Sequence, residues 1–168
     1  MAEVTLFDTE VLVELEDVER SLLETMIADL DEALQTLEAQ DPVRLRLLPD
    51  GYRDGEGGPE AAQAFREMTE EALVEGKASA LGLCAAELAT VDETIGLTLD
   101  AEALARWLRV LTDIRLALGT RLGVSARRPS LLEQLRLSSA DRAAWGAYGW
   151  LTELQESLAL AAMGQTPH

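Results

Sequence analysis

The 168-residue chain carries 31 acidic and 14 basic side chains, a formal net charge of −17, and 48% of its residues are hydrophobic. This length and composition predict a single domain over residues 1–168, with a core that needs no metal, cofactor or disulfide. The negative charge argues against binding to nucleic acid or anionic lipid, and no run of apolar residues is long enough to predict a membrane span.

The charge is unevenly distributed along the chain. Residues 1–100 hold 25 acidic and 6 basic side chains, whereas residues 101–168 hold 6 acidic and 8 basic ones. Two interpretations follow: the acidity keeps a cytoplasmic protein soluble, or it forms a surface that binds a basic partner. The first residues lack a basic region followed by an apolar run, so we expect no signal peptide and a cytoplasmic location.

Residues 1–15 are predicted to form a short β-hairpin. Two apolar segments, 4–7 and 11–13, flank the turn-like residues 8–10. Because an isolated hairpin is marginally stable in water, it should lie on a helical body that extends over residues 16–165. Residues 166–168 are expected to fray.

The first helix is predicted over residues 18–39, with Asp17 as its N-cap. Apolar residues recur at steps of three and four, which is typical of a helix packed against a core: they are Leu22, Leu23, Met26, Ile27, Leu30, Leu34 and Leu37. Asp41 followed by Pro42 predicts a second, short helix that runs through Leu47.

The glycine-rich residues 50–58 resemble a calcium-binding loop, with Asp50 and Asp54 at the first and fifth places. Tyr52 occupies the third place, however, and Ala61 stands where a bidentate glutamate is required. We therefore interpret this segment as a surface loop.

A second long helix is predicted over residues 59–90, beginning at Pro59. One seam of this helix has small residues at its centre, which would let a neighbouring helix approach closely: Phe65, Thr69, Ala72, Gly76, Ala80, Leu83 and Glu87. The only cysteine, Cys84, lies in an apolar stretch and is interpreted as a buried hydrophobic residue. Another face carries Glu67, Glu71 and Glu75 and should be solvated.

A third long helix should run from the N-cap Asp100 to Leu122, where Gly123 suits its C-terminal end. Residues 129–135 are expected to add a short helix. Ser138 and Asp141 resemble a capping box for a last helix over residues 139–163. Four principal helices joined by short loops predict a mainly all-α, four-helix-type bundle.

Several polar side chains fall on the apolar faces of these helices. Arg115 interrupts an apolar line of the third helix, and Arg121 lies within the same apolar arc. Because a buried guanidinium needs a carboxylate, we predict that one of these arginines pairs with Glu87 or Glu156, with Gln155 completing the network. The network would either fix the register of the helices or form a ligand-binding pocket.

Catalytic groups are scarce in the sequence. The only histidine is His168, at the end of the chain, so the sequence offers no histidine for a catalytic pair or a metal site. We expect no catalytic residue, no cofactor site and no metal site. Carboxylate or arginine chemistry remains an alternative, but we expect a protein that is not an enzyme. Trp107, Trp145 and Trp150 stand at helical core spacings, which favours core packing over a platform for stacking bases.

Four blocks of the sequence, residues 41–52, 65–70 together with Lys77, 107–122 and 150–158, resemble an uncharacterised actinobacterial family, the domain of unknown function numbered two-zero-one-seven. The resemblance implies no catalytic residues. Genes of this family often lie near that of a Clp protease adaptor, which implies a link to protein turnover. Some members are labelled transcriptional regulators, although no helix-turn-helix pattern is present here.

The sequence as a whole favours a non-enzymatic protein-interaction or adaptor domain. Its partner would be another protein, for which the acidic charge favours a basic one, or a second copy of the chain. One alternative is a small-ligand binder that uses the predicted arginine–glutamate pocket. Another is a DNA-binding regulator, whose surface would need these arginines to converge: Arg106, Arg109, Arg127, Arg128, Arg136 and Arg142.

Overall fold

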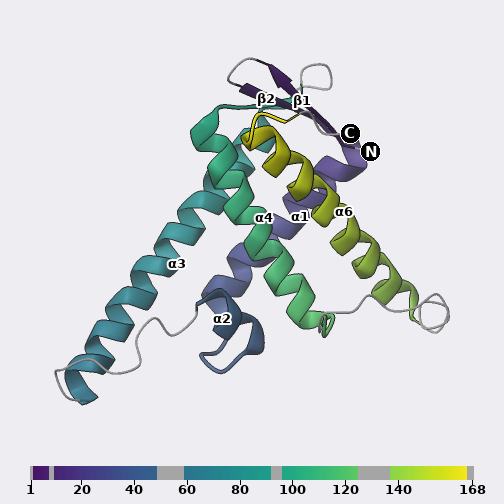
Figure 1. The fold of residues 1–168 in the computed structure, drawn as a ribbon. Coiled ribbons are helices and arrows are strands. Elements are labelled where there is room, and N and C mark those ends of the chain that lie inside the picture. Colours follow the sequence, from purple (N-terminus) through teal and green to yellow (C-terminus); the bar gives the residue numbers. More distant parts are fainter. Residues whose placement is uncertain (1, 8–9, 49–58, 92–95, 125–136, 166–168) are drawn as a thin grey trace.

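The computed structural model describes residues 2–7, 10–48, 59–91, 96–124 and 137–165, and in residues 59–67 it describes the backbone alone. In these residues a small antiparallel sheet covers one end of a group of helices (Figure 1). The helices are α1 (Asp17–Thr36), α2 (Pro42–Leu47), α3 (Pro59–Ala89), α4 (Ala101–Arg121) and α6 (Ser139–Ala162). The strands are β1 (Glu3–Phe7), β2 (Glu10–Glu14) and β3 (Leu97–Leu99). The predicted mainly α-helical fold with an N-terminal hairpin is confirmed.

Three sequence predictions lie outside the described residues. They are the surface loop at 50–58, the short helix at 129–135 and the frayed end at 166–168.

The predicted hairpin is part of a three-stranded sheet in the order β1-β2-β3. Val13 pairs with Val4 on β1 and with Leu97 on β3, and all three side chains are buried. Alternate side chains therefore face the helices, as the period of two in a strand requires. Strand β3 was not predicted, because its three residues are too few to show alternation.

Local capping signals set the starts of the helices. The side chains of Asp41, Asp100 and Ser138 accept hydrogen bonds from backbone N–H groups in the first turns of α2, α4 and α6. The predicted cap of α1 was wrong by one residue, because Glu16 is the N-cap and forms a reciprocal capping box with Glu19.

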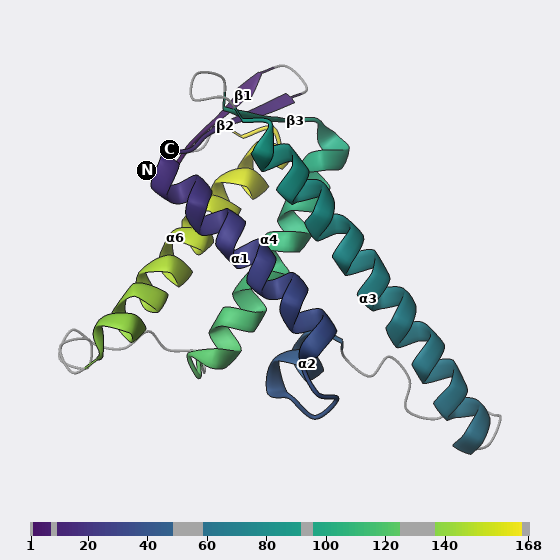
Figure 2. The ribbon, with the colours of Figure 1, turned by 180° about the vertical axis from the view of Figure 1, so that it is seen from behind.

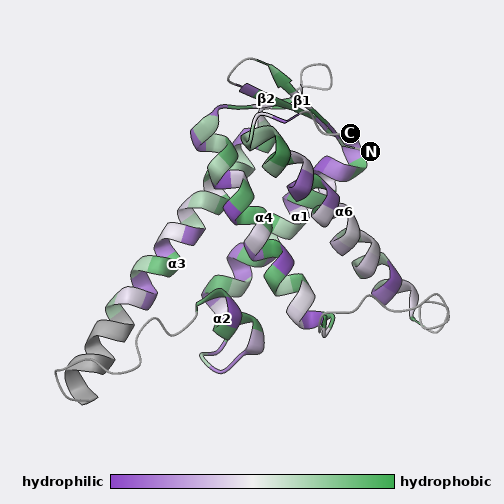
Figure 3. Ribbon diagram, in the orientation of Figure 1, coloured by the Kyte–Doolittle hydropathy of each residue, from purple (hydrophilic) through white to green (hydrophobic). Residues whose placement is uncertain are grey.

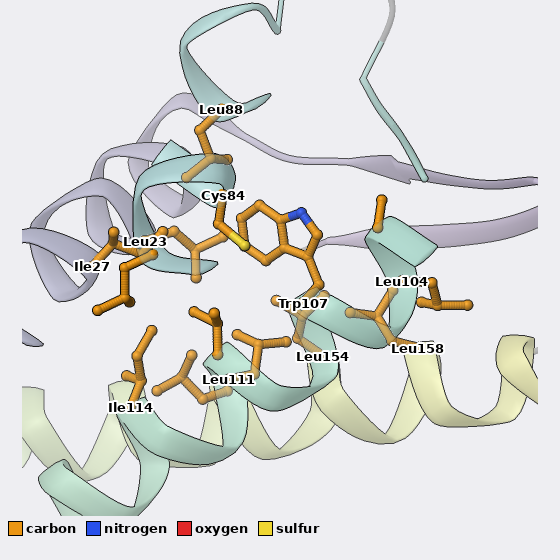
Figure 4. Packing of buried hydrophobic residues seen from close by; sticks show 14 of the residues in the cluster. Leu23, Ile27, Cys84, Leu88, Leu104, Trp107, Leu111, Ile114, Leu154 and Leu158 are labelled. Atoms are coloured by element: carbon orange, nitrogen blue, oxygen red, sulfur yellow. The ribbon is translucent and has the colours of Figure 1, made fainter. Parts of the chain in front are cut away.

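A continuous apolar core joins the sheet to α1, α3, α4 and α6 (Figure 4). Trp107 of α4 is 1% exposed and Cys84 of α3 is fully buried, as the sequence analysis predicted for both. Among the helices that the structure describes, none is both long and apolar enough to cross a membrane.

The long helices lie closest together beneath the sheet and spread apart towards the opposite end (Figures 1 and 2). Helix α3 has 31 residues and is therefore about 46 Å long at about 1.5 Å per residue. Its first half extends away from the other helices (Figure 1), and hydrophobic and hydrophilic residues alternate along the part of α3 that is coloured in Figure 3.

The predicted packing seam of α3 was wrong. Ala72, Gly76 and Leu83 of that seam are exposed, and α3 instead contributes Leu81, Cys84 and Leu88 to the core. The small residues Ala72 and Gly76 share an exposed face, whereas Ala80 of the same seam is half-buried against the core and Glu87 contacts α4.

Candidate functional site

Arg115 on α4 is held by neutral side chains. Its Nη1 donates a hydrogen bond to Oε1 of Gln155 on α6 at 2.6 Å, and its guanidinium lies over the ring of Tyr148, 5.4 Å from the ring centroid. Gln155 in turn donates to Oγ1 of Thr112 at 2.7 Å. The predicted contact between Arg115 and Gln155 is present, but in the described part of the chain no carboxylate pairs with this guanidinium.

The predicted pairing of Glu87 on α3 with Arg115 was wrong. The carboxylate of Glu87 accepts hydrogen bonds from a guanidinium nitrogen of Arg106 and, at 2.7 Å, from the indole nitrogen of Trp107. Arg106 lies nine residues before Arg115 on α4, which corresponds to about 13 Å along the helix axis. Glu87, near the C-terminal end of α3, lies level with the first half of α4 and meets Arg106 there.

The prediction that Arg121 and Glu156 belong to a buried network was also wrong, because both side chains are exposed. Each lies at the edge of the apolar face of its helix. From such a position a long side chain extends its charged end into water.

Glu19 is a buried carboxylate that the sequence analysis missed, and its side chain is 8% exposed. It accepts hydrogen bonds from the backbone nitrogens of Ala2 (2.8 Å) and Glu16 (3.0 Å) and from the indole nitrogen of Trp150 (2.8 Å). Glu19 thereby joins the start of the chain, the first turn of α1 and helix α6. Its place three residues after the N-cap was the sequence signal for this role.

The thiol of Cys84 lies close to the Glu87 and Arg106 pair. Burial and the negative charge of Glu87 raise the pKa of Cys84 to about 12, against the opposing effect of Arg106. Although burial works against it, the hydrogen bond and charge of Glu87 raise the pKa of Arg106 above its ordinary value. The thiol is therefore protonated at neutral pH and the guanidinium is charged.

We expect Cys84 to react slowly with thiol reagents, because the thiolate is the nucleophile and burial excludes the reagent. Labelling with Ellman's reagent at neutral pH should be complete in denaturant and negligible in the folded protein over the same time. Rapid labelling of the folded protein would contradict this assignment.

An open groove lies between α3 and α4, with a volume of about 620 Å³. Its lining is mainly apolar or small: Ala72, Leu73, Gly76 and Ala80 of α3, with Leu108 and Val110 of α4. Lys77 of α3 and Asp113 of α4 also line it and form an ion pair across it at 2.6 Å. Both side chains of this pair are largely buried, so the pair fixes the distance between the two helices.

Exposed apolar side chains extend the groove along α3. Met68, Leu73 and Leu83 are 71%, 43% and 49% exposed. On the neighbouring surface of α4, Leu116 is 39% exposed. Large apolar side chains grouped in this way on a water-exposed surface are typical of an interaction site.

A second hollow, of about 380 Å³, lies at the C-terminal end of α4. Its described lining includes the guanidinium groups of Arg46 and Arg115, the ring of Tyr148 and the backbone near Gly119. This hollow is where the ligand-binding interpretation of Arg115 would apply. In the described residues no group of three or more histidine, cysteine, aspartate or glutamate side chains is placed to hold a metal ion.

Comparison with known proteins places the chain in a family. Residues 1–162 match Domain of unknown function (DUF2017). The chain belongs to the DUF2017 family. This agrees with the resemblance seen in the four sequence blocks and covers almost all of the chain.

Two curated relatives of this DUF2017 chain are proteins named "Oxidative stress regulator AosR", from Mycobacterium tuberculosis and Mycobacterium bovis. Each is 33% identical to it over 135 residues, which cover 74% of this chain and 59% of the relative. The match thus spans less than two thirds of the length of these relatives. No solved structure matches the chain.

Proposed function

We propose that this DUF2017 chain is a regulatory protein that acts by binding another protein in the groove between α3 and α4. The observation that carries the proposal is the open groove itself, apolar in its lining and extended by the exposed side chains of α3. The name of the mycobacterial relatives supports a regulatory role. A cytoplasmic location and a link to protein turnover are part of the same proposal.

The free energy available at this surface favours binding. Covering the exposed part of a half-exposed leucine or methionine side chain stabilises a complex by about 1 kcal/mol. Met68, Leu73 and Leu83 lie on one helix and can be covered together by one partner. The ion pair of Lys77 and Asp113 is already formed, so a partner need not supply a charge to neutralise either of them.

A DNA-binding regulator is less well supported. Of the six arginines that would form its surface, Arg106 is bound to Glu87, and Arg127, Arg128 and Arg136 lie outside the described residues. The net charge of −17 repels phosphate groups. An electrophoretic mobility shift of genomic fragments at low salt would favour the DNA-binding alternative.

The proposal is tested with two matched glycine variants of α3. A Cβ added at Gly76, in the groove, or at Gly82, on the exposed outer surface, meets no atom within 4 Å. Gly76→Gln should fill the groove, Gly82→Gln should not, and both should fold because glutamine is a better helix former than glycine.

Tagged wild-type and variant chains would be expressed in the source organism, and captured proteins quantified by mass spectrometry. We expect a partner that the wild type and Gly82→Gln retain and that Gly76→Gln loses. If Gly76→Gln and Gly82→Gln capture the same proteins in the same amounts, the groove is not the binding surface.

A further inference from the structure

We propose that the hollow at the C-terminal end of α4 binds a small organic anion, in which a phosphate or carboxylate group is joined to an apolar body. The hollow has a volume of about 380 Å³, within the range of about 300–1,000 Å³ that is usual for small-molecule sites. It shares no described lining residue with the groove between α3 and α4. The inference therefore goes beyond the proposed function and does not depend on it.

Arg46 supplies one unpaired positive charge to the hollow. It lies on α2, which packs against α4, and its side chain is exposed. In the described part of the chain it forms no hydrogen bond or ion pair. Arg44, two residues earlier, lies on another face of α2 and pairs with Glu70 at 2.6 Å. Helix α2 thus uses Arg44 to join elements of the fold and leaves Arg46 free to bind an anion.

Arg115 supplies a second charge, which is already oriented. Its Nη1 donates to Gln155 at 2.6 Å, and its guanidinium lies over the ring of Tyr148. Both partners are neutral, so they fix the direction of the guanidinium without cancelling its charge. Among the described residues, Nη1 is the only nitrogen of Arg115 with a hydrogen-bond partner, and Nε is buried without one. The guanidinium therefore lacks acceptors that an anion would provide.

No carboxylate opposes an anion within the described lining, although the chain has 31 acidic side chains. Asp113, two residues before Arg115, lines the groove instead, where it pairs with Lys77. Salt screens the more distant acidic groups beyond about 8–10 Å. The backbone carbonyls at the end of α4 carry about half a negative charge, which is less than the charge of the two guanidinium groups. The local field thus favours an anion.

The rest of the described lining suits an apolar body. The side chains of Leu116 and Val124 and the ring of Tyr148 form much of it. Gly119 lets this ring lie against α4, because a Cβ at that position would be 3.3 Å from the ring. Guanidinium groups bind carboxylate or phosphate through paired N–H donors. An anion held in this way would place its apolar part against these side chains.

Isothermal titration calorimetry of the full chain with three probes tests the inference. Phenyl phosphate has both an anion and a ring, inorganic phosphate has only the anion, and benzyl alcohol has only the ring. Phenyl phosphate should bind at least about tenfold more tightly than either, and its affinity should fall as salt screens the charges. Equally tight binding of benzyl alcohol would overturn the need for an anion, and equally tight binding of inorganic phosphate would overturn the apolar body. Undetectable binding of phenyl phosphate at millimolar concentrations would overturn the site.

Two matched arginine variants locate the site. Arg46→Gln and Arg121→Gln each remove one positive charge from an exposed side chain that has no ion pair in the described part of the chain, and Arg121 is not part of the described lining. Both should fold as the wild type does, because neither side chain holds another described residue. Arg46→Gln should weaken binding of phenyl phosphate about tenfold, and Arg121→Gln should leave it nearly unchanged. Equal weakening by both variants would show that binding follows net charge and would overturn the hollow as the site.

Discussion

Replacing Glu19 with alanine should lower the free energy of unfolding by about 3 kcal/mol. The variant removes a buried carboxylate that accepts hydrogen bonds from the backbone nitrogens of Ala2 and Glu16 and from the indole of Trp150. A buried donor left without an acceptor costs about 1–3 kcal/mol, and bonds to charged groups lie at the upper end. For a chain of this length the thermal midpoint should fall by about 6–12 °C.

A second variant measures how much of this loss of stability comes from the hydrogen bond of the Trp150 indole. Trp150→Phe keeps an aromatic ring in place and removes the single N–H donor, so it should cost about 1 kcal/mol beyond the change in packing. In the double variant the two losses should be less than additive, because both remove the same hydrogen bond. If the free energy of unfolding of Glu19→Ala lies within about 0.5 kcal/mol of the wild-type value, the carboxylate does not hold these elements together.

Replacing Glu87 with alanine should also lower the free energy of unfolding by about 3 kcal/mol. The change leaves Arg106, whose side chain is 13% exposed, without its carboxylate, and leaves the indole of Trp107 without an acceptor. Removing one partner of a buried ion pair costs about 3–5 kcal/mol, and the partial exposure of Glu87 places this variant at the lower end. Chemical denaturation would measure the loss.

Arg115→Met is the matched comparison for Glu87→Ala. Arg115 is bound to the neutral amide of Gln155, so its removal leaves no unpaired charge and should cost about 1 kcal/mol. Glu87→Ala should also lower the pKa of Cys84, because the charge of Glu87 contributes to raising it. A larger loss for Arg115→Met than for Glu87→Ala would contradict the pairing of Glu87 with Arg106.

Local signals made much of the helical fold predictable from the sequence. Asp41, Asp100 and Ser138 cap their helices as predicted, because a cap depends on residues a few positions apart. Strand β3 was not predictable in this way, since its pairing with β2 joins residues far apart in the sequence.

The site was predictable only in part, for a different reason. Helical periodicity gives the face of a residue and not its height relative to a neighbouring helix, so it placed Glu87 and Arg115 on inner faces without showing that Glu87 lies level with Arg106. It likewise identified the small residues Ala72 and Gly76 as a packing face without showing what covers them. In the structure that face is open, and this is the basis of the proposed function.

Site-specific photo-crosslinking tests the docking groove most directly. A photoreactive amino acid would be placed at Leu73 in the groove or at Val18, which is 69% exposed on α1, and activated in cells of the source organism. We predict a discrete adduct with a partner protein from position 73 and none from position 18. Adducts from position 18 alone, or a chain that stays uncrosslinked at position 73 while its regulatory effect is intact, would contradict binding in the groove.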